Sequence, residues 1–427
     1  MDLCNDLVDI LGVGFGPANV ALAAALEELA PKLRVRFIEG RNGPHWQPNM
    51  LLPGSDIQNH PLRDLVTPRN PRSRYSFTNY LFENRRLYEH LNLPLHYPLR
   101  VEYAQYVSWV ASFFVDSVDY GSAAKRVTLV DEDSNFPRHY LVATGNGKRY
   151  RAKSLILAPG RTPYVPAPFS QLDDPRVQHL NNYMPALATA IDSASSRCRV
   201  AVIGGSQSAV EILLHASQYP GVKQVIGYTR NFSYRQKDTS PFSDEVYFPS
   251  FVDAYYQTNS DIKQRLRNEL VTTNYSSADI DVLSQLYLRR YEQSLLGLDG
   301  LRLERCQEII ECSPREDGVL LVTKSFLNGQ LQENTFDLVI LATGFMDLGD
   351  GERQERCPAL LTDIVDTASP LAITRDYRIE AKGGLPTYLN GLCESSHGMG
   401  DAGSFSLLAI RSGTIVESLL GRLAPRV

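Results

Sequence analysis

Two segments of the chain repeat one pattern, in which an apolar strand runs into a glycine turn and then into a helix. They read VDILGVGFGPANVALAAAL (8–26) and AVIGGSQSAVEILL (201–214). Glycines at such a turn permit a tight bend and let backbone N–H groups approach a pyrophosphate at the helix N-terminus. The chain is therefore predicted to be an α/β protein with two Rossmann-like dinucleotide-binding domains.

The first of these units is predicted to bind FAD. Gly12, Gly14 and Gly16 form its turn, and Pro17 suits the first turn of the helix. The next predicted strand ends at Glu39, where a carboxylate accepts hydrogen bonds from ribose hydroxyls and would repel a 2′-phosphate. The unit therefore suits an adenosine with an unphosphorylated ribose. The alternative is a glycine turn that binds no ligand.

The second unit has the opposite preference and is predicted to bind NADPH. Gly204, Gly205 and Ser208 lie at its turn, and its next strand ends at Arg230. An arginine at this place pairs with a 2′-phosphate, although Arg230 could also be a solvated surface residue. Two nucleotide sites of opposite preference indicate hydride transfer from NADPH to a flavin.

The remaining pattern predicts the domain organisation. The strands RVTLV, HYLVAT and SLILAPG should return to the first sheet, and DLVILATG should carry the chain back between the domains. We expect an FAD-binding domain from residues 1–170 and 336–427 and an NADPH-binding domain from residues 171–335. A small helical substrate-binding segment, residues 240–275, should lie within the second domain and face the first, where pockets usually form.

Composition excludes several classes of protein. A net charge of −5 argues against general nucleic-acid binding. The six cysteines include no C-x-x-C, which favours a cytoplasmic protein with reduced thiols and argues against a disulfide reductase. The N-terminus lacks the basic region of a signal peptide, and no apolar run reaches the ~18 residues of a membrane span. The histidines show no metal-ligand spacing, so no metal is predicted.

Several longer motifs carry a family resemblance. In chain order they are GVGFGPANVALA, WQPNMLLPGSDIQ, RDLVTPRNPRSRYSFTNYL, GGSQSAVE, SPFSDE, TNYS, ILATGF and HGMGDAGSFSLLAIRSG. With these motifs the chain resembles, over essentially its whole length, the N-hydroxylating flavoprotein monooxygenases. These are the L-ornithine and L-lysine N-monooxygenases of siderophore biosynthesis.

The resemblance implies a reaction. NADPH reduces FAD, the reduced flavin and molecular oxygen form a C4a-hydroperoxide, and the distal oxygen passes to a small primary-amine substrate while NADP⁺ stays bound. The protein mainly excludes water and holds the amine unprotonated. The resemblance also implies a homo-oligomer, either a tetramer or a dimer.

The resemblance further implies residue roles. Gln58 matches a catalytic glutamine beside the flavin, and Trp46 and Gln47 lie on the flavin-side loop. The other cofactor-binding matches are Gln207 and Ser208 in the NADPH motif, Arg230 for the 2′-phosphate, and Thr343 and Gly344 in ILATGF. The substrate-binding matches are Asn274, at the substrate amino group, and Ser406, which is reached after a one-residue insertion and is also assigned to the cofactor site. A plain core aromatic is the alternative for Trp46.

The departures from the family pattern lie around the flavin and the substrate. Arg63 replaces a lysine that grips the substrate carboxylate, and Asp244 replaces an asparagine. Gln47 replaces a histidine, Asn49 a glycine and Ile57 a methionine. Arg63 can still bind an amino acid carboxylate. Alternatively Arg63 and Asp244 pair with each other, or Asp244 holds the far ammonium of a diamine such as putrescine or cadaverine.

Two other functions remain open at this point. A flavin-containing or Baeyer–Villiger-type monooxygenase shares both nucleotide motifs, but it would carry a second G-x-G-x-x-G and no charged substrate loop. A non-catalytic NADPH- and flavin-binding sensor is a third hypothesis. Amine-stimulated NADPH oxidation that yields a hydroxylamine would exclude it.

Overall fold

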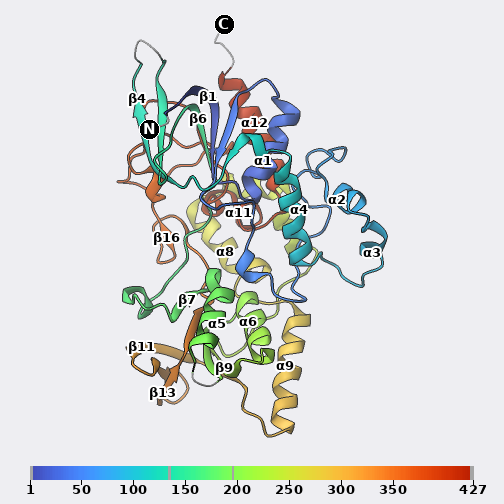
Figure 1. Ribbon diagram of the computed structural model, residues 1–427, viewed down its shortest axis with the longest axis vertical. Helices are drawn as coiled ribbons and strands as arrows, with labels where there is room; N and C mark the ends of the chain where they lie inside the picture. Colours follow the sequence, from blue (N-terminus) through green and yellow to red (C-terminus); the bar gives the residue numbers. More distant parts are fainter. Residues whose placement is uncertain (1–2, 133–135, 195–196, 424–427) are drawn as a thin grey trace.

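The computed structural model describes residues 3–132, 136–194 and 197–423, which form two lobes stacked along the longest axis of the molecule (Figure 1). One lobe contains a seven-stranded sheet and both ends of the described chain, and the other contains a five-stranded sheet. Within the described residues, no helix combines the length and apolar character needed to cross a membrane. The prediction of an α/β protein with two parallel dinucleotide-type sheets is confirmed.

The first sheet joins strands from both ends of the chain. Its strands are β1 (Leu3–Val13), β2 (Val35–Ile38), β3 (Val118–Asp119), β4 (Ala124–Val130), β5 (His139–Thr144), β6 (Arg149–Leu157) and β17 (Thr387–Leu389). They run in the order β3-β2-β1-β6-β5-β4, with β17 beside the last part of β6. All pair in parallel except β4 and β5, which form the antiparallel edge.

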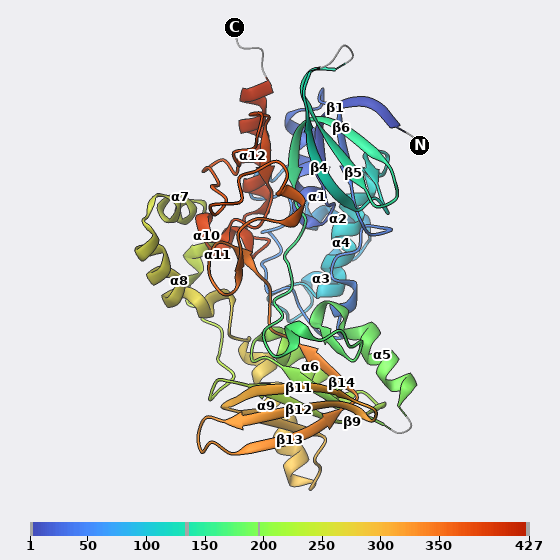
Figure 2. The same cartoon turned by 90° about the vertical axis from the view of Figure 1, so that its left-hand side faces the viewer.

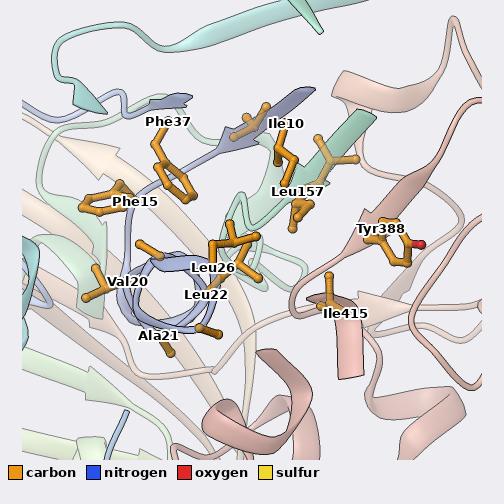
Figure 3. Packing of buried hydrophobic residues seen from close by; sticks show 14 of the residues in the cluster. Ile10, Phe15, Val20, Ala21, Leu22, Leu26, Phe37, Leu157, Tyr388 and Ile415 are labelled. Carbon is orange, nitrogen blue, oxygen red and sulfur yellow. The ribbon is translucent and has the colours of Figure 1, made fainter. Parts of the chain in front are cut away.

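Helices from the two ends of the chain pack together against this sheet. The helices of the lobe are α1 (Pro17–Leu29), α2 (Phe77–Glu83), α3 (Leu87–Leu91), α4 (Arg100–Ser112) and α12 (Leu408–Leu423). Figure 3 shows α1 end-on beneath β1, with Leu22 and Leu26 facing Ile10, and Tyr388 of β17 and Ile415 of α12 beside them. The N-terminal unit is thus closed by the last helix of the described chain.

A buried polar chain makes the same connection at the first glycine turn. The Asn19 side chain donates to the carbonyl oxygen of Gly14 at 2.7 Å. Asn390 Nδ2 donates to Asn19 Oδ1 at 3.0 Å, and Arg411 Nε donates to Asn390 Oδ1 at 2.9 Å. Arg411 is 1% exposed and also pairs with Asp401 at 3.3 Å, so its charge is compensated. Residues far along the chain therefore support the turn.

The second sheet is fully parallel and is covered on both faces. Its order is β10 (Leu301–Arg305), β9 (Val222–Thr229), β8 (Cys198–Ile203), β14 (Leu338–Leu341) and β7 (Val177–His179). Val200 and Val202 pack toward α5 (Tyr183–Ser193), α6 (Gln207–Gln218) and α9 (Ile280–Leu295). Ala201 packs toward the antiparallel strands β11 (Gln307–Arg315), β12 (Gly318–Ser325) and β13 (Leu331–Phe336). This alternation is the two-residue period of a strand buried on both faces.

The expected substrate segment, residues 240–275, packs on the first lobe although its sequence lies within the second unit. It contains the 3₁₀ helix η5 (Ser243–Tyr247), α7 (Pro249–Gln257) and α8 (Ser260–Asn274). Figure 2 shows α7 and α8 beside α10 (Glu394–His397) and α11 (Met399–Ala402), which follow the short strands β15 (Asp347–Leu348) and β16 (Gln354–Glu355) in sequence. Val246 and Tyr247 share a small buried cluster with Met399.

The structure differs from the sequence-based boundaries at one strand. The expected boundary between residues 335 and 336 assigns β14 to the first domain, but β14 pairs with β8 and β7 in the second sheet. All four of its residues are buried, because the strand is central in a sheet covered on both faces. The meander β11–β13 was not predicted from the sequence. Among the described side chains, Cys198, Cys306, Cys312, Cys357 and Cys393 are free thiols.

We expect Gly14→Ala to destabilise the ligand-free protein far more than Gly16→Ala. Gly14 has a φ of +85°, and a Cβ there would lie 2.2 Å from the carbonyl oxygen of Ala158. The expected loss in free energy of unfolding is at least ~2 kcal/mol. Gly16 has a φ of −80° and no heavy atom within 4 Å of a built Cβ, so its loss should stay below ~1 kcal/mol. Thermal unfolding followed by circular dichroism measures both, and equal losses would contradict the argument.

Candidate active site

Both glycine turns present an uncapped helix N-terminus, which is the geometry that a pyrophosphate requires. The N-cap residues of α1 and α6 are Gly16, which has no side chain, and Ser206, whose hydroxyl does not cap the helix. A Cβ at Gly204 would lie 2.5 Å from the carbonyl oxygen of Ala342, while the space around Gly16 is open. The N–H of Gln207 donates to the Ser277 carbonyl and Pro17 has no N–H, so the N–H groups that follow them in the first turn of each helix are the ones that suit phosphate oxygens. The turns therefore fit the two dinucleotides that the sequence predicts.

Glu39 lies beside the first turn, at the end of β2. Its Oε2 accepts a hydrogen bond from the backbone N–H of Phe15 at 2.6 Å, and its Oε1 accepts one from Arg41 at 2.8 Å. A carboxylate has further lone pairs available on both oxygens. Glu39 is thus fixed next to the turn and can still accept from ribose hydroxyls.

Arg230 lies beside the second turn, directly after β9. A Cβ at Gly205 would lie 2.7 Å from Oγ1 of Thr229, so the chain passes close to the turn at this point. Arg230 is exposed, and it forms no ion pair with any described residue. Its guanidinium is therefore available to an anionic group bound at the turn.

A chain of hydrogen bonds across the lobes joins the loop that carries Gln58 to the second glycine turn. Gln58 Nε2 donates to Asp279 Oδ2, and the backbone N–H of Asp279 donates to Gln207 Oε1 at 2.9 Å. Gln207 Nε2 in turn donates to Glu211 Oε1 at 2.9 Å. We call these residues the Gln58–Asp279–Gln207 chain. Gln58 comes from the flavin-side loop, and Gln207 is the first residue of α6.

A buried ion pair lies next to this chain. Arg100 of α4 donates to both carboxylate oxygens of Glu211 of α6, at 2.9 and 2.8 Å. Arg100 also donates to the carbonyl oxygens of Met50 and Asp56, each at 3.0 Å. Arg100 is 8% exposed and Glu211 is 5% exposed. The pair therefore fixes the backbone of the loop that carries Gln58 against the second lobe.

Asp56 lies on the same loop, and the pKa of its carboxyl group is raised. Its Oδ1 accepts a hydrogen bond from the Gln58 N–H at 2.9 Å. Burial, together with the negative charges of Asp279, Asp281 and Glu211, raises the pKa of Asp56 from 3.8 to about 6 against the lowering effect of that hydrogen bond. Gln58 itself has a φ of +51°, which is uncommon for a residue with a side chain. The loop is therefore held in a strained conformation.

The predicted substrate residues Arg63 and Asp244 lie near each other without pairing. The guanidinium of Arg63 lies 5.4 Å from the ring centroid of Tyr247. Burial raises the pKa of Asp244, and the positive charges of Arg63 and Lys237 oppose that rise. Among the described residues, neither charged group forms an ion pair. The direct Arg63–Asp244 pair considered above is therefore not formed.

Asn274 ends α8 close to the same place. Its Oδ1 lies 3.5 Å from the hydroxyl of Tyr247, and its buried Nδ2 has no partner. A Cβ at Gly403 would lie 2.6 Å from that Nδ2 atom, so the amide is enclosed by the C-terminal segment. An unsatisfied buried donor is costly and is expected where a ligand binds.

Glu394 and Arg161, which were not predicted from the sequence, support Tyr275 next to Asn274. Tyr275 donates from its hydroxyl to Glu394 Oε2 at 2.5 Å and accepts from Arg161 Nη1 at 3.0 Å. Burial raises the pKa of Glu394, which the charge of Arg161 opposes. These contacts anchor the end of α8 to α10 and to the strand connection between the lobes.

Ser406 is linked through Asn59 to the backbone of Arg63. Its hydroxyl donates to Asn59 Oδ1 at 2.9 Å, and Asn59 Nδ2 donates to the backbone carbonyl of Arg63 at 2.7 Å. Ser406 is 4% exposed. Its hydroxyl proton is therefore engaged within the protein. No motif in the sequence marks Asn59 as part of this site.

Trp46, Gln47 and Asn49 follow one another closely on the loop after β2. Trp46 packs edge-on against Phe405 at 4.9 Å, whereas Gln47 is exposed. Asn49 Nδ2 donates to the carbonyl of Asn181 at 2.9 Å, which ties the flavin-side loop to the second lobe.

Thr343 and Gly344 lie at the crossing that follows β14. Thr343 Oγ1 donates to the Tyr164 carbonyl at 2.5 Å, and the carbonyl of Gly344 contacts His179 Nε2 at 2.9 Å.

The described residues hold no group of three or more His, Cys, Asp or Glu side chains that could bind a metal ion.

We expect Asp56→Asn to stabilise the ligand-free protein at about pH 8 and to have a smaller effect at about pH 5. The folded protein keeps the Asp56 proton up to about pH 6, while the unfolded chain releases it near pH 3.8. The wild-type protein therefore loses stability as pH rises through this window, and the variant does not. The asparagine Oδ1 can still accept the Gln58 N–H. Thermal unfolding at the two pH values measures the difference, and an equal gain at both would contradict a raised pKa.

Comparison with known proteins gives a consistent result over the whole chain. A family model described as L-lysine 6-monooxygenase/L-ornithine 5-monooxygenase matches residues 6–347. The chain is 34% identical to the L-ornithine N(5)-monooxygenase of Pseudomonas aeruginosa, over 98% of this chain and 94% of that protein. It is 33% identical to the L-ornithine N(5)-oxygenase of Arthrobotrys oligospora, over 97% and 89% respectively.

Solved structures agree in fold and in sequence. The reduced form of ornithine hydroxylase from Pseudomonas aeruginosa superposes with a TM-score of 0.88 at 32% identity, covering 98% of this chain and 100% of that one. The ornithine N-hydroxylase of Kutzneria sp. 744, solved with reduced FAD, NADP⁺ and L-ornithine, gives 0.87 at 30% identity, with the same coverage. A cadaverine monooxygenase from Erwinia amylovora shares the fold at 0.82 and 21% identity.

Proposed function

The chain belongs to the L-lysine 6-monooxygenase/L-ornithine 5-monooxygenase family, and on this premise we propose that it is an NADPH- and FAD-dependent enzyme that N-hydroxylates the side-chain amine of L-ornithine. The observation that carries the proposal is the hydrogen-bonded chain from Gln58 of the first lobe to Gln207 at the second nucleotide turn, with Arg63 and Asn274 both beside Tyr247. The product would serve siderophore biosynthesis. The alternative substrates within the family's chemistry are L-lysine and a diamine.

In this proposal each lobe holds one cofactor. FAD would bind at Gly12, Gly14 and Gly16, with Glu39 at its ribose and Gln58 beside the flavin. The first domain comprises residues 1–170 and the chain that follows β14. When bound, the flavin takes hydride from NADPH and activates oxygen for transfer to the amine. The tight packing of Trp46 against Phe405 supports a role in excluding water from this region.

NADPH would bind in the second lobe. The support for this assignment is the uncapped N-terminus of α6 and the exposed Arg230 at the end of β9. Gly204, Gly205 and Ser208 would contact the pyrophosphate, and Arg230 would pair with the 2′-phosphate. Gln207 acts mainly by joining α6 to Asp279, since its side chain is engaged within the protein.

The charges at the substrate site favour an amino acid over a diamine. The guanidinium of Arg63 can donate two parallel hydrogen bonds to a carboxylate. Asp244, also without an ion-pair partner among the described residues, can accept the α-ammonium of the same zwitterion. Asn274 is then left to orient the substrate amino group. A diamine would satisfy Asp244 and leave the Arg63 charge without a partner.

We expect L-ornithine to stimulate NADPH oxidation and to yield a hydroxylamine, with lysine, putrescine and cadaverine less effective. Arg63→Ala should raise the KM for ornithine by about tenfold or more, because a charge-assisted hydrogen-bonded pair is lost. Arg63→Lys should recover part of the loss. Steady-state kinetics combined with a hydroxylamine assay measure both. Activity on diamines alone would show that the substrate assignment is wrong.

Arg230→Ala should raise the KM for NADPH about tenfold or more and leave the KM for NADH unchanged, because only NADPH carries the 2′-phosphate. The same variant with NADH is its own control for damage to the fold. Initial-rate measurements with each nucleotide test the assignment. A parallel rise in both KM values would place the 2′-phosphate contact elsewhere.

A further inference from the structure

Asp279 occupies a capping position but does not cap its helix. It is the N-cap residue of α9, where an aspartate carboxylate ordinarily accepts a hydrogen bond from a backbone N–H of the first turn. No such bond is formed, and the carboxylate instead accepts from Gln58 Nε2 on the opposite lobe. Residues 58 and 279 are separated by 221 positions in the sequence. The local role of the side chain has thus been replaced by a contact across the lobes.

This contact determines which way the Gln58 amide points. An ionised carboxylate is only an acceptor, so Gln58 must turn its NH₂ group toward Asp279 and its carbonyl Oε1 to the other side. Oε1 accepts no hydrogen bond from a described residue, and it is the end of the amide left for a ligand. The Gln58 backbone is fixed as well, because its N–H donates to Asp56 at 2.9 Å.

The same residue reaches the second nucleotide turn. The backbone N–H of Asp279 donates to Gln207 Oε1 at 2.9 Å, and the backbone N–H of Gln207 donates to the carbonyl of Ser277 at 2.9 Å. Gln207 is the first residue of α6, whose N-terminus faces the proposed NADPH pyrophosphate. A displacement at this turn therefore acts directly on the residue that orients Gln58.

We propose that Asp279 is a positioning residue that fixes the Gln58 amide for the flavin and makes its orientation depend on the NADPH-binding turn. The inference rests on the proposed function, because it assigns Gln58 to the flavin. Without Asp279 the amide can rotate, and the flavin site loses a defined acceptor. The reduced enzyme should then release more H₂O₂ from NADPH, O₂ and a proton, at the expense of amine hydroxylation.

A double-mutant cycle on the full-length protein tests the proposal. Asp279→Ala should raise the FAD dissociation constant about fivefold or more, measured by flavin fluorescence without any amine. In a Gln58→Ala background the same change should add less than about twofold, because the residue acts through Gln58. Additive effects would overturn the inference, since they would mean that Asp279 acts on the fold and not on Gln58.

Asp281→Ala is the matched control. Asp281 lies on the first turn of the same helix, is exposed, and carries the same charge without contacting Gln58. The FAD dissociation constant of the Asp281→Ala variant, and the H₂O₂ that it forms per NADPH, should stay within about twofold of wild type. Equal effects of the two variants would also overturn the proposal, because charge alone would then explain them.

Asp279→Asn keeps the shape of the side chain and guards against failure of the alanine variant to fold. An asparagine can pair with either end of the Gln58 amide, so the orientation is no longer fixed. We expect an unchanged melting temperature and at least a threefold rise in the H₂O₂ formed per NADPH. In an enzyme whose wild type hydroxylates the amine, no rise would overturn the proposal. FAD affinity is measured without substrate. Non-additive effects of Asp279→Ala and Gln58→Ala on the FAD dissociation constant, in an enzyme that hydroxylates no amine, would refute the proposed function and leave this inference standing.

Discussion

The Arg100–Glu211 ion pair is the contact on which the arrangement of the two lobes depends. Burying two charges is costly, and here two parallel hydrogen bonds between the side chains and two backbone carbonyls offset that cost. Loss of either partner would leave an uncompensated charge in the interface. The pair holds the loop with Asp56 and Gln58 against α6, the helix that begins at the second nucleotide turn.

The geometry of the proposed substrate site depends on this arrangement of the two lobes. Arg63 follows the same loop, Tyr247 and Asn274 come from the segment inserted in the second unit, and Ser406 supports the loop from the C-terminal side. No single segment contains the site. Its charged groups lie outside the two sheets, while the buried contacts hold the frame. The sequence keeps the family pattern at the glycines and departs from it at Arg63 and Asp244.

The sequence predicts what local pattern encodes. The strand–turn–helix units, Glu39 and Arg230 follow from residues close together in the chain, and the structure places them beside their turns. Asp279, Glu211 and Arg100 were missed because each looks like an ordinary charged residue of a helix surface until the lobes are brought together. The expected domain boundary falls before β14 and not after it, because a short apolar strand carries no mark of its partners. The strands β11–β13 alternate too irregularly to distinguish a meander from loops.

The support of the first glycine turn by Asn390 and Arg411 has a consequence for synthesis. The turn and α1 leave the ribosome first, yet the side chains that hold Asn19, and the helix α12 that covers α1, are made last. The second lobe is continuous in sequence from β7 to β14 and can close on its own while translation continues. The second nucleotide unit can thus be completed before the first, and the apolar face of α1 can be covered only after α12 has been synthesised.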